Sequence, residues 1–282
     1  MQRVAFFLLL PICSVTAQTA LNLSQDLVAM GIASSNMTPN QPALDAGPLL
    51  TSGVAYAVAH QIPSVIANPG TYYFLSVQSN GAHVILNQPA NVAIDFHGSN
   101  LILANEQRNG IQIQQGSNVT LQNFSLDYQQ TPYTQVQVVS VDKAQRQVQF
   151  TVPSGWRNPS VFSGIQQLAN TLNGYYLFFF RNGQRIGTLN RMSFQTPVTG
   201  NSFTIVDAGA ATNATASSQI RPGDTALLAM RSNEQALFAN GCTGCAFRNI
   251  QIYASPGASS SQSRGHGQTR CGSQKHLDSY VR

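Results

Sequence analysis

Hydrophobic and polar residues alternate in short runs along the first half of the chain. Between Gly110 and Tyr128 three such runs follow one another: Ile111–Ile113, Val119–Leu121 and Phe124–Leu126. Alternation of this kind is typical of a β-strand with one buried face. The residues between the runs include Gly, Ser and Asn, which favour tight turns. The pattern therefore predicts short strands that follow one another closely.

The three runs recur at a fixed distance. Val84 precedes Ile111 by 27 residues, and Val92 precedes Val119 by the same 27 residues. A constant step with three strands in each step predicts a solenoid of parallel strands. The same pattern returns at Ala236–Ile252, which predicts that the winding resumes near Glu234, with one extra residue between Gly241 and Cys245. The turns are expected at Asn91, Asn100, Asn118 and Asn123.

The segment between the two parts of the solenoid has a different pattern. Its candidate strands are longer and are separated by polar turns, and they lie at Val136–Val141, Val148–Val152, Tyr175–Phe180, Ser202–Val206 and Ala226–Met230. Asn182-Gly183 is a typical hairpin turn. These features predict an antiparallel β-barrel or sandwich inserted between turns of the solenoid.

The first residues have the form of a signal peptide. Arg3 precedes the apolar run Val4–Leu10, and Val15-Thr16-Ala17 offers a cleavage site after Ala17. The apolar run is too short to span a bilayer, and no later segment reaches 18 apolar residues. We therefore expect a secreted or periplasmic protein with no membrane association after cleavage. Cys13 does not indicate a lipoprotein, because Ile12 is too large for the usual lipobox.

Composition narrows the class of partner. Charged residues make up 9% of the chain, compared with about 25% in a typical soluble domain. The net charge of +5 comes largely from the leader and from the last residues of the chain, so the body carries no basic stripe for nucleic acid. A surface rich in uncharged polar residues suits an oligosaccharide or polysaccharide partner.

Two groups of residues carry a family resemblance. A short apolar strand at Val65-Ile66 followed by Pro69-Gly70-Thr71-Tyr72 resembles the start of the parallel β-helix in pectin-lyase-like proteins. An inserted β module, preceded by Asp127-Tyr128 and followed by Pro222-Gly223-Asp224 and an apolar strand, resembles α-1,3-galactosidase-type glycoside hydrolases. The resemblance extends over roughly Ile66–Ala258. It implies an all-β fold, a right-handed parallel β-helix with three strands per coil and an inserted antiparallel module.

This interpretation divides the chain into segments. A lead-in at 18–64 is expected to contain a short helix at Leu49–His60 that caps one end of the core, although an ordinary surface helix has the same pattern. The full division is a signal peptide at 1–17, the lead-in at 18–64, first coils at 65–128, the insertion at 129–233, a resumed coil at 234–258 and a tail at 259–282. The tail lacks strand-like runs. We expect it to be irregular and unrelated to the fold, through truncation or a frameshift.

Glycoside hydrolysis commonly uses two carboxyl groups that flank the scissile bond. We expect Asp127 to be a general acid/base or a sugar ligand at the junction with the insertion, and Tyr128, Arg231 and Glu234 to bind substrate there. The alternative is that Asp127 caps backbone N–H groups and that Arg231 pairs with Glu234. Asp95 and His97 are expected to line a solvated face. The resemblance implies that catalytic carboxyl groups lie beyond the insertion, where few coils remain.

The sequence therefore predicts a secreted, glycan-active β-helix protein. The first hypothesis is a glycoside hydrolase similar to α-galactosidases, or a truncated remnant of one. The alternative is a carbohydrate-binding or surface structural protein without catalysis. Whether the chain is an enzyme stays open at this point.

Other motifs predict no cofactor and no metal. Cys242-Thr243-Gly244-Cys245 is a single CxxC without nearby zinc ligands, so we expect a turn and a candidate disulfide between Cys242 and Cys245. Gly265-His266-Gly267 matches a motif of polygalacturonases, but the acidic motifs of those enzymes are missing, and we interpret the match as coincidence. No acidic cluster suits a calcium-dependent lyase.

Overall fold

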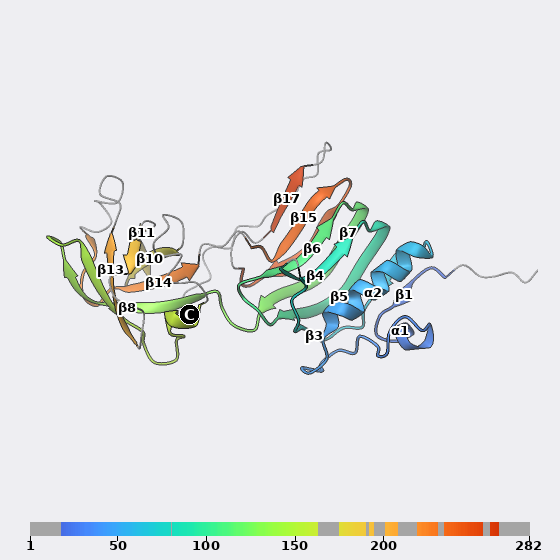
Figure 1. Cartoon of the computed structure of the whole chain (residues 1–282), viewed down its shortest axis with the longest axis horizontal. Coiled ribbons are helices and arrows are strands. Elements are labelled where there is room, and N and C mark those ends of the chain that lie inside the picture. Colours follow the sequence, from blue (N-terminus) through green and yellow to red (C-terminus); the bar gives the residue numbers. More distant parts are fainter. Residues whose placement is uncertain are drawn as a thin grey trace, which may run out of the picture.

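The protein is mostly β-structure, as the all-β prediction requires, and contains both parallel and antiparallel sheets. In Figure 1 the antiparallel strands form a lobe apart from the parallel sheets. The computed structural model describes residues 18–79, 81–162, 175–189, 192–194, 201–207, 219–230, 234–255 and 260–264. The predicted signal peptide at 1–17 and the motif at 265–267 lie outside these residues.

Two parallel sheets enclose the main core. The first sheet contains β1 (Leu21–Asn22), β2 (Ser64–Ile66), β3 (Thr71–Phe74), β5 (Ala90–Leu103), β7 (Ser117–Tyr128) and β16 (Ala246–Ile252). The second contains β4 (Ala82–Asn87), β6 (Asn109–Gln114), β15 (Leu237–Cys242) and β17 (Ser260–Arg264). The chain passes from the second sheet to the first in β4–β5, β6–β7 and β15–β16, and we call each of these pairs a repeat unit.

The register of the repeat units confirms the predicted step. Val84 of β4 pairs with Ile111 of β6, 27 positions later. Ile111 pairs with Leu237 of β15, 126 positions later, and Thr120 of β7 pairs with Ala246 of β16 at the same 126-residue shift. The extra residue predicted between Gly241 and Cys245 is therefore wrong. Leu237, rather than Ala236, takes the place of Ile111, because its branched side chain fills the core position above it.

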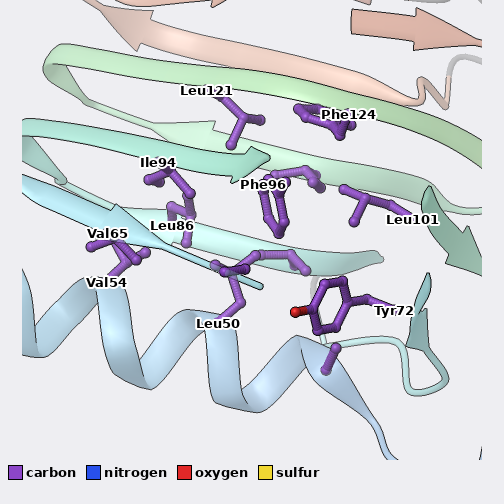
Figure 2. Packing of buried hydrophobic residues seen from close by; sticks show 14 of the residues in the cluster. Leu50, Val54, Val65, Tyr72, Leu86, Ile94, Phe96, Leu101, Leu121 and Phe124 are labelled. Atoms are coloured by element: carbon purple, nitrogen blue, oxygen red, sulfur yellow. The ribbon is translucent and has the colours of Figure 1, made fainter. Parts of the chain in front are cut away.

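Side chains from both sheets stack in layers inside the core. Val65, Ile94 and Leu121 pair in register on β2, β5 and β7, and Figure 2 shows them one above the other. Each is at most 1% exposed, and burying a side chain of this size stabilises the fold by roughly 1.5–3 kcal/mol. Phe96 and Phe124 add an edge-to-face contact at 5.4 Å between ring centroids. The core between the two parallel sheets thus extends without a break from one repeat unit to the next.

Helix α2 (Ala46–Ala59) covers one end of this core. Its buried Leu50 and Val54 lie under the first layer of core residues (Figure 2). The helix begins at Asp45, whose Oδ1 accepts hydrogen bonds from the N–H groups of Gly47 at 3.1 Å and Leu75 at 3.0 Å. The predicted capping helix is therefore present, three residues earlier than expected at its start. A short helix α1 (Asp26–Ala29) precedes it.

Amide side chains mark the bends of the first sheet. Asn91, Asn118 and Asn123 all have positive φ angles, between 52° and 60°, and Asn tolerates this left-handed conformation better than most residues. These three predicted turns are confirmed. Asn100 does not have a positive φ and pairs with Ser125 of β7, so the turn predicted there is wrong; the bend of β5 lies earlier, at His97, whose φ is 50°.

The antiparallel sheet lies between Tyr133 and Met230, inside the range predicted for the insertion. Its strands are β8 (Tyr133–Asp142), β9 (Gln147–Thr151), β10 (Tyr175–Arg181), β11 (Gln184–Leu189), β12 (Met192–Phe194), β13 (Ser202–Asp207) and β14 (Thr225–Met230). A short 3-10 helix, Pro159–Val161, follows β9. The predicted hairpin is confirmed, because Asn182 and Gly183 have positive φ and join β10 to β11. The module has a hydrophobic core of its own.

The tail departs from the prediction at its start. Residues 260–264 form β17, which pairs in parallel with β15. The sequence Ser-Ser-Gln-Ser-Arg has no apolar alternation, but the edge of β15 offers backbone N–H and C=O groups that any sequence without proline can satisfy. Among the described residues, no helix is long and apolar enough to cross a membrane.

Candidate functional site

The outward side of the first sheet brings a carboxylate between aromatic side chains. In register, Tyr73 of β3, Ile102 of β5 and Asp127 of β7 lie side by side. Tyr253 follows β16 and donates its N–H to the carbonyl of Leu126 at 3.0 Å, which places it next to Asp127. Tyr253 is 52% exposed. Because neighbouring strands lie about 4.8 Å apart, these outward side chains form one continuous row.

A second row of polar side chains runs beside the first. Asn100 and Gln251 are exposed, and Ser125 lies between them in register. The hydroxyl of Ser125 donates to the side-chain oxygen of Asn100 at 2.6 Å. We call the two rows together the Asp127 face, and its residues are Tyr73, Asn100, Ile102, Ser125, Asp127, Gln251 and Tyr253.

The carboxyl group of Asp127 is half-buried, and little in its surroundings stabilises its negative charge. Burial raises its pKa above the ordinary value, and the one opposing contribution is a hydrogen bond of 2.8 Å from the N–H of Tyr128 to Oδ1. Within the described part of the chain no ion pair reaches this carboxylate. Asp45, Asp95 and Asp224 have lowered pKa values instead. Unlike the other carboxyl groups with a shifted pKa, that of Asp127 can therefore still accept hydrogen bonds from a ligand.

Asp95 is occupied by the fold. Its Oδ2 accepts hydrogen bonds from Gln122 and Asn123, both at 2.8 Å, and its Oδ1 accepts the N–H of His97 at 2.8 Å. Burial alone would raise its pKa, but these hydrogen bonds outweigh burial and lower it. Asn249 continues the ladder by donating to Asn123 at 2.8 Å. Asp95 thus holds the bend of the first sheet together and offers little to a ligand.

Tyr128 points into the core, contrary to the prediction that it binds substrate. It is 4% exposed, and its hydroxyl donates to the carbonyl of Arg108 at 2.9 Å. Burial raises the pKa of its phenol, and the negative charge of Glu234 raises it further. Because side chains alternate along β7, Tyr128 and Asp127 face opposite sides of the sheet.

Of the other two predicted binding residues, only Glu234 can be placed relative to the Asp127 face. Arg231 lies outside the described residues. Glu234 acts on the phenol of Tyr128 on the inner side of β7. The outward neighbours of Asp127 in register are Ile102 and Tyr253, and neither is acidic. A second carboxyl group on the same face, as glycoside hydrolysis commonly requires, is therefore missing among the described residues.

His83 is a buried residue that the sequence analysis missed. Its Nε2 accepts the N–H of Asn105 at 3.0 Å, so Nδ1 carries the proton and donates to the carbonyl of Asn109 at 2.9 Å. Its ring lies edge-on to Tyr128 at 6.3 Å. Burial lowers the pKa of His83, and the hydrogen bond to Asn109 and the charge of Asp45 only partly oppose this.

We expect His83 to make the fold sensitive to mild acid. Because its pKa in the folded state is below the ordinary 6.5, the unfolded chain binds more protons than the folded protein as the pH falls below this value. The free energy of unfolding should fall on acidification, by at most about 1.4 kcal/mol per pH unit from this group. Urea denaturation of the wild type and of His83→Gln between pH 7.5 and pH 5 measures the difference. If the free energy of unfolding depends on pH equally in the two proteins, the expectation is wrong.

An ion pair joins the two lobes and was also missed. Nη1 of Arg157, in the antiparallel module, lies 2.7 Å from Oε1 of Glu106, in the loop between β5 and β6. The same Nη1 donates to the carbonyl of Thr131 at 3.2 Å. The two residues are 51 positions apart, and no local pattern connects them. Their contact positions the module against the parallel sheets.

The cysteine pair lies at a bend between the two parallel sheets. Cys242 ends β15 and is half-buried, and Cys245 is buried just before β16. Both are thiols in this structure, and a hydrogen bond links them. The predicted disulfide is therefore not formed here and stays a prediction. In the described part of the chain, no group of three or more His, Cys, Asp or Glu side chains could hold a metal ion.

Comparison with known protein families found no matching family, and comparison with characterised protein sequences found no significant match. The function of the protein is therefore inferred from the residues of this chain alone.

Proposed function

We propose that the protein is a secreted carbohydrate-binding protein, built on a right-handed parallel β-helix similar to those of pectin-lyase-like proteins, with an inserted antiparallel module. The stacked repeat units, in register at a step of 27 residues, support the β-helix. The signal-like leader supports secretion. The Asp127 face is the proposed binding site.

The observation that carries this proposal is the placement of Asp127 in the outward row. Aromatic rings provide flat apolar surfaces for the C–H faces of sugars, and their preference for such contacts is general. A carboxylate accepts hydrogen bonds from two hydroxyl groups, and side-chain amides both donate and accept them. Tyr253 and Tyr73 supply rings, Asp127 the carboxylate, and Asn100 and Gln251 the amides. A chain of neutral sugar units matches this combination of groups.

A second candidate function is glycoside hydrolysis, in the manner of α-galactosidases. The raised pKa of Asp127 favours it, because a general acid must hold its proton near the working pH. The lack of a second carboxyl group beside Asp127 in the described residues supports the binding protein instead. Turnover that is lost in Asp127→Asn would establish the hydrolase.

The decisive experiment measures binding to a panel of α-galactosides and pectic oligosaccharides by calorimetry, with product analysis of the same mixtures. We expect Asp127→Asn to weaken binding about tenfold to a hundredfold, because a hydrogen bond to a charged group contributes about 1.5–3 kcal/mol. Tyr253→Ala should weaken binding about tenfold. The control Asp142→Asn changes an exposed turn carboxylate in the inserted module and should have no effect.

The melting temperatures of the same variants provide a second test of the proposal. Since burial disfavours the charge of Asp127, Asp127→Asn should raise the melting temperature while it weakens binding. A protein that is folded and binds no member of the panel, or one that Asp127→Asn leaves unchanged in affinity, would contradict the proposal.

A further inference from the structure

The two thiols lie against Gly116, at the bend of the neighbouring repeat unit. Gly116 precedes β7 at the bend below Cys242, and the 126-residue shift places Cys242 directly over it. A Cβ atom on Gly116 would lie 3.1 Å from Sγ of Cys245 and 3.3 Å from Sγ of Cys242. Both sulfur atoms therefore converge on the space that a side chain at position 116 would take.

The backbone holds this bend firmly in place. The N–H of Thr243 donates to the carbonyl of Gly116 at 2.9 Å, and the N–H of Asn118 donates to the carbonyl of Thr243 at 2.8 Å. Gly244, with φ +68°, completes the turn between the two cysteines. The two thiols are thus brought together by contacts that do not depend on a bond between them.

We propose that Cys242 and Cys245 are a redox-active thiol pair that closes to a disulfide by exchange with a small disulfide such as oxidised glutathione. The thiolate of Cys242, the less buried of the two cysteines, attacks one sulfur of the oxidant and releases one thiol. Cys245 then loses its proton and attacks Cys242, which releases the second thiol. Two protein thiols are oxidised and one disulfide is reduced to two thiols. This inference requires an oxidising compartment and so depends on the proposed secretion, but not on the proposed sugar binding.

The two steps should differ in rate. Burial, the hydrogen bond to Cys242 and the charge of Cys242 raise the pKa of Cys245 to about 12. The contributions of Cys242 disappear once it is in the mixed disulfide, but burial remains and keeps the thiolate of Cys245 scarce at neutral pH, so we expect closure of the disulfide to be the slower step. A mixed disulfide on Cys242 should accumulate first, and the rate of closure should rise with pH.

The experiment uses the full chain with Cys13→Ser and Cys271→Ser, so that Cys242 and Cys245 are the remaining cysteines. We expect oxidised glutathione to produce first an adduct and then a protein that has lost two hydrogen atoms, with one link between Cys242 and Cys245 on peptide mapping. The melting temperature should rise by a few degrees and return when dithiothreitol is added. Adding Cys245→Ser should stop the reaction at the adduct, and Gly116→Ala should slow closure by crowding the sulfur atoms.

Two results would overturn the proposal. One is a folded protein, by circular dichroism, in which both thiols still react with iodoacetamide after oxidation. The other is a disulfide from either cysteine to Cys271 in the unmodified chain. The unmodified chain is mapped in parallel, so that a variant that folds poorly does not decide the outcome.

Discussion

Replacing Arg157 with methionine is expected to lower the free energy of unfolding by about 3 kcal/mol, because it leaves a buried charge without its partner. The side chain of Glu106 is 9% exposed and that of Arg157 27% exposed, at an N–O distance of 2.7 Å. The guanidinium group also lies 4.9 Å from the ring centre of Phe162. Methionine keeps much of the apolar contact but removes the charge, so the carboxylate of Glu106 is left without its partner.

Trp156 makes this prediction easy to measure. It is the one tryptophan of the chain and precedes Arg157 directly, so its fluorescence in urea reports on this junction, while circular dichroism reports on all β-structure. Adding Glu106→Gln to Arg157→Met should recover much of the loss. The control Arg248→Met makes the same change at an exposed site on β16 and should stay within about 0.5 kcal/mol of the wild type. Equal losses at Arg157 and Arg248 would contradict the prediction.

Gly110→Ala should destabilise the protein by a similar amount, about 3 kcal/mol, through overpacking. An added Cβ atom would lie 2.2 Å from the carbonyl oxygen of Ala236 and 2.7 Å from Cδ1 of Leu103. The carbonyl of Ala236 cannot move away freely, because it accepts the N–H of Ile111 at 3.0 Å. The substitution therefore forces β6 and β15 apart where the chain returns from the inserted module.

Gly98→Ala is the matched control for Gly110→Ala. An added methyl group at Gly98 would meet no atom within 4 Å, although its φ of +80° is unfavourable for alanine. It should cost about 1 kcal/mol from the backbone alone. Denaturation midpoints in urea, followed by circular dichroism, compare the two. If Gly110→Ala costs no more than Gly98→Ala, the close approach of β6 and β15 is not a constraint on stability.

The register of the parallel strands could be predicted because the apolar pattern repeats. Val84 and Ile111, and Val92 and Val119, are partners in the structure at the spacing read from the sequence. The prediction failed where the repeat carried no apolar signal, as in β17, whose pairing depends on backbone groups alone. The predicted register at Ala236 is wrong by one position. The apolar pattern begins at this small residue, but the larger Leu237 is the partner of Ile111.

The candidate site was predicted only in part. Asp127 was found because carboxyl groups are scarce in this chain. The inward direction of Tyr128 could also have been predicted, since Phe124 and Leu126 face the core and Tyr128 has the same parity on β7. The roles of His83 and of the ion pair between Glu106 and Arg157 depend on contacts between distant segments, and their local sequence gives no sign of them.

The two spacings between partners in the second parallel sheet have a practical consequence. Val84 and Ile111 are 27 positions apart, whereas Ile111 and Leu237 are 126 apart. Both pairs are nevertheless direct partners on neighbouring parallel strands. The inserted module therefore occupies the position of the loop between β5 and β6 in the preceding unit, and its terminal strands β8 and β14 pair with each other, which brings its two ends close together. This position is a natural attachment point for exchange of modules, at which evolution or protein engineering can substitute another domain without shifting the strands around it.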